Sequence, residues 1–296
     1  MQPRSFAALY HGVGWDCPED NIIVSAGVTM GNFKSSPINT LYERLCTENK
    51  VDEGDPFNYE VYALFTKKQK EEMYFDFGSS YSLIDQYSNV LALHLGQPIS
   101  MCRLLWSDDN FKSITSTERI YYSTEVVSNV IGDKNITLSE QNVKDIKRLW
   151  GNVRKLYRNY DYNGRLINIL TYYYAAWRSH SIEQIIINLA IVLEIIFAPH
   201  SQSEVSHQVS FNISKYLGNN RDERVDIYNT IRNFYRMRSA IIHGGIPGFD
   251  KIESVAAPVY AMVTKIVLSI FSNVNKIEIF SDDKQRRDML FDFLFE

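Results

Sequence analysis

The chain has 296 residues, of which 45% are hydrophobic, and a formal net charge of -4. It is therefore long and apolar enough to bury one large core or two ordinary ones, and its composition excludes a disordered protein. The negative net charge argues against broad, non-specific attraction to nucleic acid, although it leaves room for a local basic site. The three cysteines are far apart and form no CxxC pair, which favours free thiols in a reducing cytosol.

No segment predicts a membrane anchor. The longest apolar run, Ile185–Pro199, contains Asn188 and Glu194 and is too short to cross a bilayer, so it is typical of a buried helix. The first residues lack the basic start and continuous apolar stretch of a signal peptide. We therefore expect a cytoplasmic protein that does not bind a membrane.

Residues 1–135 predict a small α+β domain, because short β-like runs alternate there with turn-forming residues. One amphipathic helix is expected over Ser80–Leu95, ended by Gly96, with loops at Ser35–Pro37 and Glu53–Pro56. No glycine-rich phosphate loop, nucleophile elbow or metal-ligand spacing occurs in this region. The expected strands are Asn21–Ala26, Tyr59–Phe65, Glu72–Phe77, Ile99–Trp106 and Arg119–Val127.

The pattern changes after Gly132, and residues 136–296 predict an all-α helical bundle. Thr137 and Glu140 form a capping-box pattern that would start a helix reaching about Asn159. Pro258 would lie in the first turns of a later helix, where proline is tolerated. The remaining expected helices are Arg165–Arg178, one capped by Ser181 and Gln184 that ends at Phe197, Glu204–Leu217, one within Arg221–Gly245, Ser254–Val274, and a short one after Ser281.

The stretch Arg221–Gly245 has a helical period that places Arg238 at the centre of its apolar stripe. At about 100° per residue, Ile231, Phe234 and Tyr235 lie within roughly 60° of Arg238. A guanidinium keeps its proton, so burying it costs several kcal/mol unless a carboxylate or an anion balances the charge. Glu194 could supply the carboxylate. A structural ion pair and an anion site are thus both open at this point.

His243 follows Arg238 by five residues and precedes Gly244 and Gly245, which can end the helix. Histidine is the side chain whose unperturbed pKa lies near neutrality, which suits proton transfer. On an ideal helix Arg238 and His243 lie about 140° apart. They would share one site only if the helix frays before Gly244 or if the site forms across a dimer. Alternatively, His243 interacts with the last carbonyls and the helix dipole.

The C-terminal half resembles the HEPN superfamily, and most closely its ApeA-like branch of prokaryotic defence proteins, over roughly residues 140–275. The signature is an Arg, four to six residues and a His near the end of a core helix, which Arg238 and His243 match. The AlaIleValLeuGluIleIlePhe segment at 190–197 is similar to the acidic core helix of that branch. The TyrArgMetArgSerAlaIleIleHisGly run at 235–244 is similar to its terminal helix.

The resemblance implies a metal-independent endoribonuclease without a cofactor, acting in antiviral defence or abortive infection. Arg238 would stabilise the charge of the scissile phosphate, and His243 would exchange a proton with the 2'-hydroxyl or the departing oxygen, leaving a cyclic phosphate. Glu194 and Ser239 would support or orient the arginine. Because the chain holds one such motif, a composite site requires a homodimer through the 221–245 helix.

RNA is the expected substrate, and Arg232 and Arg236 could line an RNA groove on the side of the helix that carries His243. A solvated charged face explains these two arginines equally well. The domain formed by residues 1–135 would sense an unknown trigger or select the substrate. A second functional interpretation is a non-catalytic HEPN module that dimerises and binds RNA or protein, since Ser239 stands where active families commonly carry Asn, Asp or His.

Overall fold

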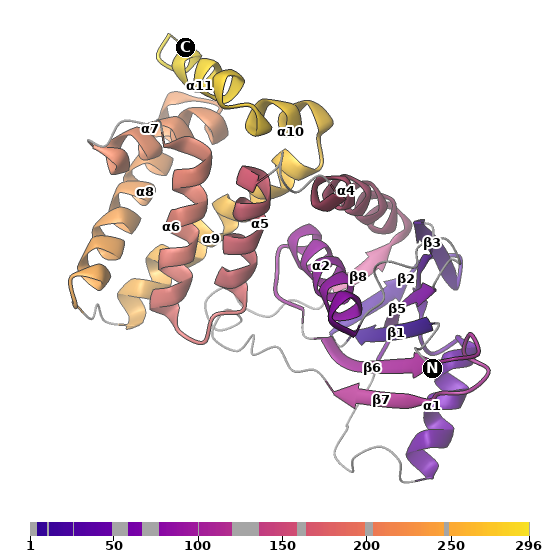
Figure 1. Ribbon diagram of the computed structural model, residues 1–296. Coiled ribbons are helices and arrows are strands. Elements are labelled where there is room, and N and C mark those ends of the chain that lie inside the picture. The colour runs from indigo at the N-terminus through magenta and orange to yellow at the C-terminus, as the bar shows by residue number, and fades with distance from the viewer. Residues whose placement is uncertain are drawn as a thin grey trace. The chain divides into compact units, whose positions relative to one another are not determined.

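A computed structural model describes residues 5–10, 12–25, 27–48, 59–66, 77–99, 101–119, 136–158, 164–198, 204–245 and 249–295. The chain divides into two compact units. The first contains all the described strands, the helices α1 and α2, and helix α4 as far as Gly151. The second contains the end of α4 and the helices α5 to α11 (Figure 1). An α+β region followed by a helical region confirms the predicted order of fold classes.

The first unit is built on a six-stranded antiparallel sheet with the order β3-β4-β5-β1-β6-β7. Its helices are α1 (Pro37–Thr47) and α2 (Phe77–Leu95). A separate parallel pair joins β2 to β8. The strands are β1 (Ser5–Tyr10), β2 (Val13–Asp16), β3 (Asn21–Ser25), β4 (Val28–Asn32), β5 (Val61–Thr66), β6 (Met101–Ser107), β7 (Ser116–Arg119) and β8 (Ile136–Ser139).

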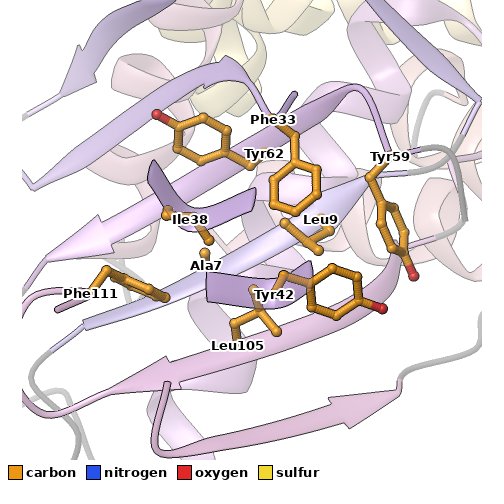
Figure 2. Close-up of a cluster of buried hydrophobic side chains, with 9 residues drawn as sticks. All are labelled: Ala7, Leu9, Phe33, Ile38, Tyr42, Tyr59, Tyr62, Leu105 and Phe111. Atoms are coloured by element: carbon orange, nitrogen blue, oxygen red, sulfur yellow. The ribbon is translucent and has the colours of Figure 1, made fainter. Parts of the chain in front are cut away.

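Strand β1 lies inside the sheet and is buried on both faces, so its sequence SFAALY shows no alternation of polar and apolar residues. On one face, Ala7 and Leu9 pack in a cluster that also contains Ile38 and Tyr42 of α1. Figure 2 shows this cluster, with the rings gathered over the strands. Its remaining buried members are Phe33, Tyr59, Tyr62, Leu105 and Phe111.

The opposite face of the sheet carries a chain of aromatic contacts. The Phe6 and Phe65 rings stack at 4.6 Å, and Phe65 meets Tyr87 of α2 edge to face at 5.5 Å. Tyr87 in turn contacts Trp150 of α4 at 5.2 Å. Aromatic pairs of this geometry add to the stability that area burial alone supplies. Helix α1 thus covers one face of the sheet, and α2 and α4 contribute to covering the other.

The strand predictions are confirmed for β3, β5 and β6, each to within a few residues. The predicted strand Glu72–Phe77 lies outside the described residues except for Phe77, which begins α2. The predicted strand Arg119–Val127 also lies outside them apart from Arg119, which ends β7. Helix α2 begins earlier than Ser80 and ends before Gly96, which has the positive φ of 68° expected of a helix terminator.

The loop predicted at Ser35–Pro37 is confirmed at Ser35 and Ser36, whereas Pro37 already begins helix α1. The Ser36 hydroxyl accepts a hydrogen bond from the Asn39 amide at 3.3 Å, and Pro37 occupies the first turn. A serine cap followed by proline is a favoured helix start. The same two residue types also favour turns, so the sequence did not reveal that a helix starts at Pro37.

The second unit is helical. Its helices are α5 (Gly164–Trp177), α6 (Ile182–Phe197), α7 (Val205–Leu217), α8 (Arg221–Ile242), α9 (Phe249–Phe271), α10 (Val274–Ser281) and α11 (Asp283–Asp292). Helix α6 contacts α5, α7, α8 and α9, and Figure 1 shows it in the middle of this group. Most of its residues are buried, including Ile185, Leu189 and Leu193. Its apolar composition follows from this central position.

Most of the helix predictions are confirmed, with three corrections at helix boundaries. Helix α4 (Glu140–Arg158) does not start from a Thr137 cap, because pairing with β2 holds Thr137 in an extended strand. Ser139 caps it instead, accepting from the Asn142 amide while the Asn142 side chain accepts from the Ser139 amide. Helix α9 begins at Phe249 rather than Ser254, so that Pro258 lies in its interior.

The C-terminal end of α9 also differs from the prediction, which ran to Val274. The helix ends at Phe271, and Asn273 caps a new helix, α10, by accepting from the amides of Asn275 and Lys276. Within α9, Ser254–Phe271 is long and apolar enough to cross a bilayer, but 50% of this stretch is buried inside the protein. The core helix of a soluble protein passes the same test.

Arg286 of α11 hydrogen-bonds to the C-terminal end of α6. Its side chain is 2% exposed, and one of its nitrogens donates to the carbonyls of Ile196 and Ala198, both at 3.0 Å. The last carbonyls of a helix have no partner within the helix. A buried cation at that end satisfies them and complements the helix dipole.

Replacing Arg286 with Met should therefore lower the stability of the protein by about 2–4 kcal/mol, because buried carbonyls lose their donor. Urea unfolding followed by circular dichroism measures the change. Arg287→Met is the matched control: this half-exposed arginine pairs with Asp283 at 3.5 Å, and exposed pairs contribute about 0–1 kcal/mol. Equal losses in the two variants would contradict the role assigned to Arg286.

Candidate functional site

Helix α8 is defined by caps at both ends, which fix the positions of its arginines. At the start, the Asn220 side chain accepts from the Glu223 amide at 2.9 Å, and Glu223 accepts in return from the Asn219 amide at 2.9 Å. At the end, the Gly245 amide donates to Ala240 at 2.8 Å and the Gly244 amide donates to Ile241 at 3.0 Å.

These two terminal hydrogen bonds, together with a φ of 81° at Gly244, form a Schellman motif. His243 is the last residue before the left-handed glycine, and its side chain is exposed. The prediction that the two glycines end this helix is confirmed. His243 thus lies at the solvent-exposed tip of α8.

Arg238 meets Glu194 of α6, as the sequence allowed. The Arg238 Nη2 atom lies 3.8 Å from the Glu194 Oε1 atom, and the two side chains are 33% and 30% exposed. The stripe does not bury Arg238 completely: Phe234 and Met237 are buried, but Ile242 is 48% exposed, so the apolar stripe opens towards the end of the helix. The guanidinium therefore lies between α6 and α8 but remains partly exposed to solvent.

A pocket of about 360 Å³ opens beside this ion pair, between α6, α7 and α8. Arg238 lines it together with Arg232 and Arg236, whereas Glu194 is the only carboxylate among its lining residues in the described part of the chain. The lining thus carries an excess of positive charge. The other lining residues are Val205, Ser206, Tyr235 and Ser239.

One polar atom of these lining residues, the Arg238 Nε, is buried without a hydrogen-bond partner among the described residues. The Tyr235 hydroxyl faces Glu194. Burial raises the pKa of Tyr235 well above its ordinary value, and Glu194 adds to the effect through its charge and as a hydrogen-bond partner, so the hydroxyl keeps its proton. An anion bound in the pocket would satisfy the Arg238 Nε.

The structure brings together most, but not all, of the predicted site residues. Arg232, Arg236, Arg238, Glu194 and Ser239 line one pocket, although the helical wheel had placed the first two with His243. Long arginine side chains can reach around a helix, and Arg232 reaches α7, where it donates to the Ser206 hydroxyl at 2.8 Å. His243 does not line this pocket.

Three of the lining residues, Val205, Ser206 and Tyr235, were not predicted as site residues from the sequence. Tyr235 was assigned to the apolar stripe, and its ring is indeed buried. Only its position beside the pocket and Glu194 distinguishes it from a core tyrosine, and no residue pattern reveals that. Ser206 lies on a different helix, so its approach to Arg232 depends on how α7 packs on α8.

No protein-family model, curated protein or solved structure matches the chain. Among the residues that the structure describes, no three His, Cys, Asp or Glu side chains come close enough to hold a metal ion. The arrangement of charges in the pocket is therefore the basis for assigning a function.

Replacing Tyr235 with Phe should leave the free energy of unfolding within about 0.5 kcal/mol of the wild-type value, because the interaction of its hydroxyl with Glu194 falls outside ordinary hydrogen-bond geometry and is weak. Tyr173→Phe is the matched control, since the buried Tyr173 hydroxyl lies 2.9 Å from the Thr264 hydroxyl. That variant should be less stable by about 1 kcal/mol. Urea unfolding compares them, and equal destabilisation would show that the Tyr235 hydroxyl is already paired.

Proposed function

We propose that the protein is a metal-independent endoribonuclease of the HEPN type that acts as a homodimer in antiviral defence. The observation that carries the proposal is the pocket in which Arg238 lies beside two further arginines and a single carboxylate. Fixed guanidinium groups in a partly enclosed site stabilise the charge that develops on a phosphodiester during cleavage. They also bind phosphate through charge-assisted hydrogen bonds.

Glu194 positions Arg238 without neutralising it fully. At 3.8 Å, the pair is longer than a charge-assisted hydrogen bond, which is typically about 2.7–2.9 Å. Donors on the guanidinium therefore stay available to a ligand. Ser239, the next residue along the helix, also lines the pocket and could donate to the same anion.

The proton transfer is assigned to His243, and its place favours a site shared by two chains. His243 is exposed at the end of α8 and does not line the pocket of Arg238. An isologous contact through α8 would place the His243 side chain of one subunit towards the arginines of the other. The histidine would then accept the proton of the attacking 2'-hydroxyl or protonate the departing oxygen.

The second candidate function is a non-catalytic module that dimerises and holds RNA. The separation of His243 from the pocket favours it, because the arginines alone bind phosphate without cleaving it. In either case, we propose that the sheet-containing first unit senses a trigger or selects the RNA.

The ribonuclease proposal predicts cleavage of single-stranded or transfer RNA by the purified protein in EDTA, with cyclic phosphate ends. Arg238→Ala should lower the rate about 10²–10³-fold, as the loss of a transition-state donor does. His243→Ala should lower it about 10²–10⁴-fold, as the loss of an acid–base group does. Arg221→Ala, an exposed arginine at the start of the same helix, controls for charge. Intact RNA with the wild type at every concentration would contradict the proposal.

A shared site predicts complementation between two inactive variants. Mixing Arg238→Ala and His243→Ala chains, after reversible dissociation, should restore roughly a quarter of the wild-type rate, since half of the randomly formed dimers carry one intact site of two. No recovery in a mixture shown to contain mixed dimers would place both residues in one chain's site. Tight RNA binding without cleavage by any form would favour the non-catalytic module.

A further inference from the structure

A second pocket, formed by α7 and the beginning of α8, combines apolar surface with positive charge. It measures about 300 Å³, and we call it the α7–α8 pocket. Phe211, Val225 and Tyr228 supply its apolar surface, and Val225 is 48% exposed. Within the described part of the chain no carboxylate lines it. Its charged lining residues are Lys215, Arg221 and Arg224.

The segment Asp288–Phe295, at the end of α11, has the opposite charge and a similar apolar content. Its sequence, DMLFDFLF, contains two aspartates and no cation, and we call it the apolar tip. Phe291 is 59% exposed, Leu294 61% and Phe295 76%. Exposed apolar side chains that lie close together mark an interaction surface. The apolar tip therefore lacks a partner in the structure of the single chain.

The apolar tip is held in a fixed shape by its own chain. Leu290 and Phe293 are only 5% and 9% exposed and anchor it. Beyond α11, the Phe295 amide donates to the Asp292 carbonyl at 3.0 Å. The rings of Phe291 and Phe295 meet edge to face at 5.2 Å. Such preorganisation lowers the entropy that binding costs.

The charges of the two surfaces are available to a partner. Arg224 donates to the Gly218 carbonyl at 3.0 Å and not to a carboxylate. Four other charged side chains of the two surfaces form no ion pair with any residue that the structure describes. They are Lys215 and Arg221 in the α7–α8 pocket, and Asp288 and Asp292 in the apolar tip.

We infer that the apolar tip of one chain docks into the α7–α8 pocket of a second copy. Leu294 and Phe295 would cover the apolar surface of the pocket, while the two aspartates of the tip meet its cations. An apolar centre gives such a contact its affinity, and opposite charges around it fix its orientation. Because the tip and the pocket are different surfaces, the contact closes a pair only when it forms twice about a two-fold axis.

This contact is separate from the dimer proposed through the end of α8, and it does not rest on ribonuclease activity. Arg221, in the α7–α8 pocket, and Arg238 are separated by about 25 Å along the axis of α8. Loss of the contact should therefore leave the RNA site unchanged. A chain that uses both interfaces would build assemblies larger than a dimer.

Sedimentation velocity of the full chain over a range of concentrations tests the contact. A double variant, Leu294→Ser with Phe295→Ser, should weaken this self-association about 10–100-fold, as the loss of central apolar anchors does. Where the dimer through α8 also forms, the double variant should stop at that dimer while the wild type forms larger species. Val274→Ser is the matched control, because Val274 is 53% exposed and belongs to neither surface, and it should match the wild type.

An exchange of charges tests which surfaces meet. A pocket variant, Lys215→Glu with Arg224→Glu, should not associate with itself through this contact, and neither should a tip variant, Asp288→Lys with Asp292→Lys. A mixture of the two variants should recover the association, since each pocket then meets a tip of opposite charge. Circular dichroism establishes that both variants are folded. No recovery in a mixture of folded variants would overturn the assigned pairing.

Identical sizes of the wild type and the Leu294→Ser, Phe295→Ser variant at every concentration would overturn the second copy as the occupant. The pocket would then fit an acidic and apolar partner other than this chain. Failure of this contact is distinguishable from failure of the proposed ribonuclease. Uncleaved RNA together with the expected changes in size would reject the nuclease and keep the contact, and cleavage with unchanged sizes would do the reverse.

Discussion

The positive charge of Arg238 in the seam between α6 and α8 is the constraint on which the candidate site depends. Its partner is Glu194 of the apolar helix α6, whose Oε1 atom lies 3.8 Å from the Arg238 Nη2 atom. A fully buried pair would serve only to hold the two helices together, and a fully exposed pair would contribute little to stability. With both side chains about one third exposed, the pair keeps the guanidinium in place while leaving it accessible to an anion.

The surrounding helices extend this one charge into a basic pocket. Helix α6 is held centrally by its apolar contacts and by Arg286 at its C-terminal end, while α7 packs against α8 and brings Ser206 to Arg232. The positive lining is thus a product of packing between three helices. In a chain of net charge -4, positive charge is thus concentrated locally, as the proposed binding of RNA requires.

Much of the second unit could be predicted from the sequence, because long amphipathic helices with caps carry strong local signals. The cap at Ser181 and the glycine terminator of α8 are examples. Strand β1 could not be predicted, since burial on both faces removes alternation. Nor could β4, in which a Cβ at Gly31 would lie 2.5 Å from the Asp20 carbonyl oxygen: the glycine required by this close approach weakens the strand pattern.

The candidate site was predictable only in part, because side-chain reach and the packing between helices decide which residues meet. Arg238 and Glu194 were identified because a charge at the centre of an apolar stripe demands a partner. The grouping of Arg232 and Arg236 with Arg238, rather than with His243, depends on side-chain reach and on the position of α7. Helical angles describe where Cβ atoms point, whereas a guanidinium lies several bonds further away.

A structure of the full chain with bound 2'-O-methyl RNA tests the central claim most directly. The account predicts two copies joined through α8, one RNA phosphate within hydrogen-bond distance of Arg238, and the exposed His243 of the partner subunit near the adjoining ribose. RNA bound away from the arginine pocket, or copies that meet through another face with His243 far from any bound phosphate, would contradict it.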